Sequence, residues 1–266
     1  MGLSLAAGAV PQAPVPVVER LISSAGMDDL LAQYPVLIQR TLARNLAGKA
    51  LPRGLSQVFD QAIRSSFQPD DLLDEFAQAL ATRLTPEEAG HALDWYTSPL
   101  GRKVVRAEMG AVADGQALGS LDQLRERYRG TERERLFAAF DRATGSTETM
   151  LDNAQILQLA MAAAITSVVH GPTLPTYDDL KAIILKRRTA MRGEVGEQAY
   201  LNYLYTYQHL SLDELKAYIA FARSPAGQAF VQGVNAALKE TLQKRSDQMS
   251  ERLARAGAGS VPDSGV

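Results

Sequence analysis

The sequence of 266 residues contains no cysteine. This absence excludes disulfide bonds, thiolate metal sites, a cysteine nucleophile and a lipid-modified cysteine near the N-terminus. Histidine is also scarce, with three residues, which limits the general acids, bases and metal ligands available. The chain has no Gly-x-Ser-x-Gly motif for a serine nucleophile, and no glycine-rich loop follows a strand to hold a nucleotide phosphate. We therefore predict that the protein is not an enzyme, has no catalytic residues and carries neither metal nor cofactor.

A surplus of charge of one sign is missing as well. The chain has 28 Lys and Arg against 30 Asp and Glu, a formal net charge of -2, so it offers no basic field for a phosphate backbone and nucleic acid is not an expected partner. The most apolar stretch, residues 156–169, is shorter than the roughly 20 residues that cross a bilayer, and it contains Gln158. We interpret it as a central core helix and predict no membrane span.

The N-terminus carries a short apolar run, LSLAAGA, which ends in Ala7-Gly8-Ala9 and is followed by VPQAPVP. An Ala-x-Ala pattern after an apolar run is typical of a signal-peptidase site, although no Lys or Arg precedes this run. We predict that residues 1–15 are the remnant of a signal peptide with a proline-rich tether. The expected location is therefore periplasmic or secreted, and a cytoplasmic protein with a flexible start is the alternative.

Apolar residues recur at helical spacing along almost the whole chain, and no run of alternating β-branched residues predicts a strand. We therefore expect an all-α fold. Residues 28–48 form one such amphipathic helix, which Pro35 is expected to kink. A disordered tail is predicted over residues 256–266.

Two stretches repeat one pattern: LTPEEAGHALDWYTSPLGRKVV from residue 84 and LSLDELKAYIAFARSPAGQAFV from residue 210. In each, the second residue carries a hydroxyl group and is followed three positions later by Glu, the signature of a capping box at a helix N-terminus. Each then reaches Ser-Pro-x-Gly, where proline can begin a new helix and glycine lets another backbone approach closely. The residues of this structural motif are Thr85, Glu88, Ser98, Pro99 and Gly101 in the first copy and Ser211, Glu214, Ser224, Pro225 and Gly227 in the second.

The two copies of this motif keep a constant offset of 126 residues. A weaker echo between LISSAGMDDLLAQY and FDRATGSTETMLDN pairs Gly26 with Gly145 at an offset of 119. The second copy has therefore gained about seven residues, which we place in the loop HGPTLPTYD. Because Gly130 can end a helix and Thr131 can cap the next, we predict two tandem multi-helix repeats with a pseudo-two-fold relation, residues 16–130 and 131–255.

The order LISSAGMDDLL, then a helix capped by LTPEE that carries Trp95 and Tyr96, then SPLGRKV resembles the bacterial family called domain of unknown function 2059. The stretch LSLDELKAYIAFARSPAGQAF resembles the same motif, with Leu212 where the first copy has Pro86. The resemblance covers most of both repeats and is specific at the Ser-Pro-x-Gly corner. It implies an all-helical, periplasmic or secreted protein of no established activity, and it supplies no catalytic residues.

Glu88, His91 and Asp94 lie at i, i+3 and i+6, so they share a helical face. Glu-x-x-His is half of the ligand pattern of di-iron bundles, and this trio supports an alternative in which the protein is a metal-dependent or hydrolytic enzyme. However, the second copy has Ala217 and Ala220 in place of His91 and Asp94, and the sequence has no second Glu-x-x-His. The pattern therefore favours an exposed polar helix face.

The segment AYLNYLYTYQHL places Tyr200, Tyr203 and Tyr207 on one helical face. At the 126-residue offset the first copy has an aspartate and two alanines, so the shared fold does not require aromatic rings there. A tyrosine can pack its ring and keep its hydroxyl in water, which suits a ligand or partner surface. If these side chains form a recognition surface, they should be partly exposed beside a groove; if they only fill space between helices, they should be buried.

These patterns predict an exported, non-enzymatic helical repeat protein that binds an unknown partner protein or envelope ligand. The enzyme built on Glu88, His91 and Asp94 is the first alternative. A purely structural module is the second alternative, and it would oligomerise by burying its tyrosine face.

Overall fold

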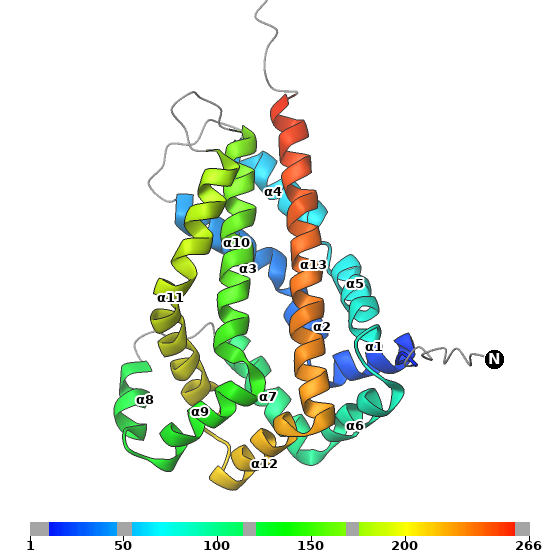
Figure 1. Cartoon of the computed structure of the whole chain (residues 1–266), viewed down its shortest axis with the longest axis vertical. Coiled ribbons are helices and arrows are strands. Elements are labelled where there is room, and N and C mark those ends of the chain that lie inside the picture. The colour runs from blue at the N-terminus through cyan, green and yellow to red at the C-terminus, as the bar shows by residue number, and fades with distance from the viewer. Residues whose placement is uncertain (1–10, 47–54, 114–120, 169–175, 259–266) are drawn as a thin grey trace, which may run out of the picture.

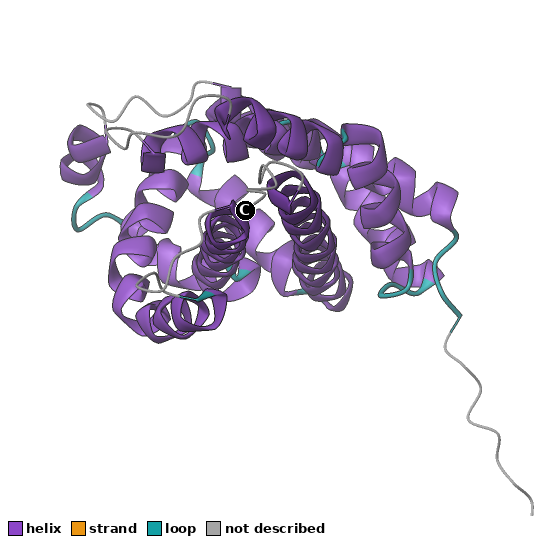
Figure 2. Cartoon of the chain, turned by 90° about the horizontal axis from the view of Figure 1, so that it is seen from above, coloured by secondary structure: helices purple, strands orange, loops and turns teal. Residues whose placement is uncertain are grey.

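The computed structural model describes residues 11–46, 55–113, 121–168 and 176–258. Every regular element in these ranges is an α-helix, as the apolar periodicity predicts (Figure 2). In chain order the helices are α1 (Val15–Ser24), α2 (Met27–Ala32), α3 (Tyr34–Leu46), α4 (Leu55–Ser66), α5 (Pro69–Ala81), α6 (Pro86–Thr97), α7 (Pro99–Ala113), α8 (Leu121–Tyr128), α9 (Glu132–Thr144), α10 (Ser146–Val168), α11 (Tyr177–Thr206), α12 (Leu212–Arg223) and α13 (Pro225–Ala258). None of these described helices is long and apolar enough to span a membrane.

The segment predicted as one kinked helix over residues 28–48 is two helices. α2 ends at Ala32 with Gln33 as its C-cap, and α3 begins at Tyr34. Pro35 therefore lies in the first turn of α3, where its missing N–H has no intrahelical acceptor to lose. The proline marks the start of a helix and not a kink within one.

Two predictions about the chain ends need correction. Ala13 is buried and its N–H donates to the carbonyl oxygen of Leu84 at 2.8 Å, so residues 11–15 are not a free tether. The disordered tail was predicted to begin at residue 256, but α13 continues to Ala258. Leu253, near the end of this helix, still packs in the core. Residues 1–10 and 259–266, which include Ala7-Gly8-Ala9, lie outside the described residues, as does most of the loop HGPTLPTYD.

The order of the helices supports the predicted duplication. α6 and α12 have 12 residues each and start 126 positions apart. Gly26 and Gly145, paired by the weaker echo, both have left-handed backbone angles, with φ of 68° and 65°. The second copy differs because it has one helix of 30 residues, α11, where the first has α4 and α5. Gly130, between α8 and α9, is also left-handed, which fits the predicted seam.

The helix that follows each Ser-Pro corner packs on the other repeat. α13 lies along α4, α5 and α6 of the first copy, whereas α7 packs against α11 and α12 of the second. α10 and α13 stand side by side along the long axis of the molecule (Figure 1). One cluster of buried apolar side chains runs from Leu21 in α1 to Leu253 in α13. The repeats therefore share a core, and separating them would expose apolar surface of both.

Arg245 fixes α13 to the first repeat. Its guanidinium group pairs with Glu75 at 2.8 Å and with Asp71 at 3.2 Å, and its side chain is only 7% exposed. A buried guanidinium group is unfavourable unless it is paired and hydrogen-bonded. These contacts therefore set the position of α13 along α5.

Candidate functional site

Both Ser-Pro corners have the geometry that their sequence predicts. Ser98 and Ser224 are extended, each with φ of -66° and with ψ of 162° and 159°. The Ser98 hydroxyl accepts a hydrogen bond from the N–H of Gly101 at 3.0 Å, and the Ser224 hydroxyl accepts one from the N–H of Gly227 at 3.1 Å. Each serine thus ends one helix and caps the next. The corner is part of the scaffold.

The capping boxes in front of the corners are also present. The Thr85 hydroxyl accepts from the N–H of Glu88, and the Glu88 carboxylate accepts from the N–H of Thr85. Ser211 and Glu214 make the same two bonds. The pairing of these residues confirms that the repeated motif is a helix-capping device.

The trio Glu88, His91 and Asp94 does not form a metal site. Glu88 uses its carboxylate in the capping box, where it accepts from both the N–H and the hydroxyl of Thr85. His91 and Asp94 are exposed. In the part of the chain that the structure describes, no group of three histidine or acidic side chains is placed to hold a metal ion. His91 and Asp94 therefore lie on an exposed polar helix face, and Glu88 is a capping residue.

The predicted tyrosine surface is largely internal. Tyr203 and Tyr207 are buried, with 1% and 5% exposure, and Tyr200 is half-buried. The Tyr203 hydroxyl donates to the carbonyl oxygen of Arg133 at 2.9 Å, so it does not point to water. Of the two alternatives, the burial of Tyr203 and Tyr207 fits rings that fill space between helices, and these two side chains do not form an exposed recognition surface.

Packing against α9 explains this burial. The rings of Phe137 and Phe140, on α9, lie 5.4 and 5.0 Å from the ring of Tyr203 between centroids. The guanidinium group of Arg133 donates to the carbonyl oxygen of Tyr207 at 2.7 Å and so satisfies the C-terminal end of α11. The tyrosines fill the space between α9 and α11 and hold these helices together.

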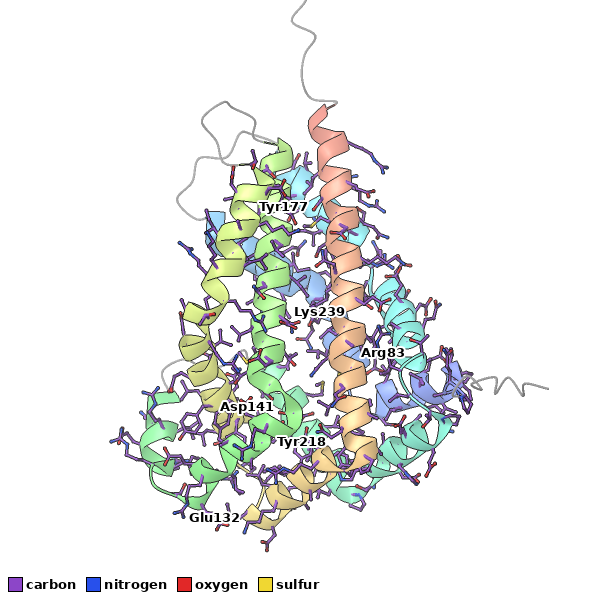
Figure 3. The ribbon with its side chains drawn as sticks, in the orientation of Figure 1. Arg83, Glu132, Asp141, Tyr177, Tyr218 and Lys239 are labelled. Carbon is purple, nitrogen blue, oxygen red and sulfur yellow. The ribbon has the colours of Figure 1, made fainter. Side chains whose placement is uncertain are left out.

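Tyr207 also contacts the carboxylate of Glu108, a residue outside the sequence motifs. Its hydroxyl donates to Oε1 of Glu108 at 2.6 Å, and the hydroxyl of Tyr218 donates to the same oxygen at 3.0 Å. Glu108 comes from α7, Tyr207 follows α11, and Tyr218 lies on α12. Tyr218 is at the end of the molecule where α9, α12 and the start of α13 meet (Figure 3). One helix of the first repeat, together with α12 and the C-cap residue of α11 from the second, therefore builds this contact.

Glu108 lines a cavity of about 420 Å³ between the two repeats. The lining side chains are mainly apolar and aromatic, with asparagine, serine and threonine side chains among them, and Glu108 is the one charged side chain among the described residues that line it. A second, apolar pocket of about 240 Å³ adjoins the cavity. The two share Leu30, Tyr34 and Asn153 in their walls.

The environment of Glu108 is unfavourable for its charge. Burial raises the pKa of this carboxyl, and the hydrogen bonds from Tyr207 and Tyr218 offset only part of that effect. Burial also raises the pKa of Tyr96, Tyr207 and Tyr218, and the nearby Glu108 raises them further. All three tyrosines therefore stay neutral, and Tyr207 and Tyr218 act as hydrogen-bond donors. Within the described chain, Glu108 has no Lys, Arg or His partner.

A comparison of the repeats would have indicated Glu108. At the 126-residue offset its equivalent is Val234, which lines the same cavity. Tyr218 has Ala92 as its equivalent, and Tyr96 has Ala222. Glu108, Tyr96 and Tyr218 therefore each occur in only one of the two copies. The same property singled out the tyrosines of α11. The fold shared by both copies does not require them.

A family model described as "Uncharacterized protein conserved in bacteria (DUF2059)" matches residues 70–123 and 205–256. Comparisons with curated proteins and with solved structures give no significant match. The first matched region begins in α5 and contains α6 and α7, and the second begins at the end of α11 and contains α12 and most of α13. Both capped helices, both Ser-Pro corners and Glu108 lie inside them. The family model thus matches one region in each repeat, which agrees with the resemblance that the motifs predicted.

Proposed function

We propose that the protein is a non-enzymatic binding protein of the bacterial cell envelope, which takes a small molecule into the cavity between its repeats. The observation that carries this proposal is the cavity of about 420 Å³ with Glu108 in its wall. Its volume falls within the roughly 300–1,000 Å³ of small-molecule sites. A mainly apolar lining with a few polar groups is also typical of such sites.

The polar groups of the cavity are held in place before any ligand enters. Tyr207 and Tyr218 orient the carboxylate of Glu108, and the rings of these two tyrosines pack against each other at 5.7 Å between centroids. A site that is already ordered loses less conformational entropy on binding. This rigidity supports selective recognition.

The location in the envelope is the second part of the proposal. It is supported by the Ala7-Gly8-Ala9 pattern and by the match to a bacterial family. We expect cleavage after Ala9 when the gene is expressed with its complete upstream region. Cell fractionation followed by N-terminal sequencing tests this, and a cytoplasmic protein that retains residues 1–9 would contradict it.

A cavity-filling variant tests the binding function. Thr149, on α10, is half-buried and lines the cavity. The purified protein would be incubated with an envelope extract, desalted, and examined by native mass spectrometry for retained small molecules. Wild type and Thr149→Ala should retain a molecule that Thr149→Phe, with its larger ring, excludes. If wild type retains nothing, or if Thr149→Phe retains the same molecule equally well, the cavity is not the binding site.

A structural, oligomerising module is the second candidate. Ile183 and Leu185, in the N-terminal half of α11, are 47% and 51% exposed, and exposed apolar side chains favour association. The tyrosine face proposed for that role from the sequence is unavailable, since Tyr203 and Tyr207 are buried. Light scattering of wild type and of an Ile183→Glu, Leu185→Glu double variant tests self-association, and a wild-type monomer would exclude it.

A further inference from the structure

Among the described residues, Glu108 has two neutral hydrogen-bond donors and no positively charged partner. Lys103, on the same helix, is paired with Glu214 at 2.7 Å. Arg133, at the other side of the tyrosine cluster, donates to the carbonyl oxygens of Tyr207 and Leu210. Glu108 is half-buried, and a carboxylate that is partly withdrawn from water is less favourable without a counter-ion. A cation that pairs with this carboxylate would come from outside the described residues.

We infer that the cavity binds an organic cation, whose ammonium group lies against the Glu108 carboxylate and whose apolar chain extends past Leu30 and Tyr34 into the adjoining pocket. This inference rests on the proposed binding function and specifies the class of ligand. It treats the two pockets as parts of one site, because they share wall residues.

Aromatic rings around the carboxylate favour a cation over other ligands. The ring of Phe140 lies 5.2 Å from the ring of Tyr207 and 6.1 Å from that of Tyr218 between centroids, and all three side chains line the cavity. The face of an aromatic ring attracts an ammonium group, most strongly where water is excluded. An anionic ligand would instead be repelled by Glu108. The lining therefore discriminates by the sign of charge.

The adjoining pocket determines the shape of the ligand. Phe67, Leu242 and Met249 are among its lining residues, and its walls are almost entirely apolar. A compact cation would leave this pocket empty, whereas an alkyl or arylalkyl chain would remove its apolar walls from water. The site as a whole fits an amphiphile with a positively charged end.

Three probes with the same chain and different head groups test this inference: n-octyltrimethylammonium, 1-octanol and octanoate. Calorimetric titration of the full chain should show that the ammonium compound binds most tightly. Glu108→Gln keeps the shape of the side chain without its charge and should weaken ammonium binding by roughly 30-fold or more, the loss expected when one partner of a buried charge pair is removed. Octanol should bind both proteins alike. Glu87→Gln, at an exposed position in the first turn of α6, is the matched control and should behave as wild type.

A second measurement does not depend on the variant. The trimethylammonium group keeps its charge at every pH, so acidification changes only the protein. The titratable groups that contact Glu108 are Tyr207 and Tyr218, with Tyr96 close by, and these stay neutral as the pH falls. Affinity for n-octyltrimethylammonium should therefore fall as Glu108 becomes protonated, whereas affinity for octanol should not change.

The outcomes separate this inference from the proposed function. Equal affinity for the ammonium compound and octanol, no effect of Glu108→Gln, or tighter binding of octanoate would overturn the cation assignment. Failure of all three probes to bind would overturn it too. In each case the extract experiment with Thr149→Phe still decides on its own whether the cavity binds any small molecule.

Discussion

Gly101 lies against the carbonyl oxygen of Trp95, so that a Cβ on this glycine would stand 2.1 Å from that oxygen. Gly227 has the same relation to Phe221, at 1.9 Å. Trp95 and Phe221 are themselves equivalent at the 126-residue offset, and their rings stack with centroids 4.1 Å apart and an interplanar angle of 5°. Because equivalent residues meet only near a symmetry axis, the stacked pair marks the pseudo-two-fold axis that relates the two copies.

Substituting either corner glycine by alanine should destabilise the protein. In Gly101→Ala and Gly227→Ala the added methyl group meets backbone, which cannot rotate away as a side chain can. We expect a loss of about 3 kcal/mol in the free energy of unfolding, at the upper end of overpacking effects. Urea denaturation measures it.

Gly110→Ala is the control, since a Cβ at this position on α7 has no neighbour within 4 Å. Alanine is the better helix former, so this variant should be more stable by up to about 1 kcal/mol. Equal effects of Gly101→Ala and Gly110→Ala would show that the helices at the corner are free to move apart.

Local signals in the sequence were sufficient to predict the helices and the Ser-Pro corners. Capping boxes and Ser-Pro-x-Gly depend on contacts within a few residues, so reading them requires no knowledge of the tertiary fold. Gly101 was expected to admit another backbone, and Trp95 is the residue whose carbonyl oxygen approaches it. The break at Gln33 was missed because a proline can either kink a helix or begin one, and only packing decides between these.

Tyr203→Ala should cost about 3–5 kcal/mol, the range for deleting a buried aromatic ring. Its ring touches Phe137, Phe140 and Tyr207, so removing it leaves a void between α9 and α11. Tyr203→Phe keeps the ring and loses only the hydrogen bond to the Arg133 carbonyl oxygen, a loss of about 1 kcal/mol. Thermal or urea unfolding measures the difference in stability between the two variants. A small effect of Tyr203→Ala would revive the view of these tyrosines as a surface.

The candidate site could be predicted less well from the sequence than the helices could. The copy-specific tyrosines were visible, but whether they face water or α9 depends on how the two repeats pack. Glu108 was missed because it lies in α7 with no motif around it, and its partners Tyr207 and Tyr218 are 99 and 110 residues away. No local pattern encodes that contact. The substitution of Val234 for Glu108 between the copies is the one sequence signal that could have pointed to it.

Arg245→Met should weaken the attachment of α13 to the first repeat. The variant keeps most of the apolar stem and removes the ion pairs to Asp71 and Glu75. We expect a loss of about 2 kcal/mol, less than for a fully buried pair, because the Asp71 side chain is 55% exposed. Arg255→Met is the control on the same helix: its pair with Glu251 is exposed, and such pairs contribute at most about 0.5 kcal/mol. Similar urea midpoints for the two variants would contradict the role given to Arg245.

Glu108→Gln should stabilise the ligand-free protein at neutral pH. Burial raises the pKa of Glu108 above its ordinary value of 4.5, so the folded protein holds this proton more tightly than the unfolded chain. The stability that the proton contributes is complete below the unfolded pKa and is lost as the pH rises through the folded pKa. Glutamine cannot ionise, so the Glu108→Gln variant does not lose this stability as the pH rises.

The difference in melting temperature between Glu108→Gln and wild type should therefore grow as the pH rises from about 4.5 and become constant above the folded pKa. Glu87→Gln, in the exposed first turn of α6, should show no comparable trend. If the difference for Glu108→Gln stays constant over this range, then its carboxylate is well solvated in the empty cavity. In that case the lack of a counter-ion is no longer an argument for a cationic ligand, because water already stabilises the charge.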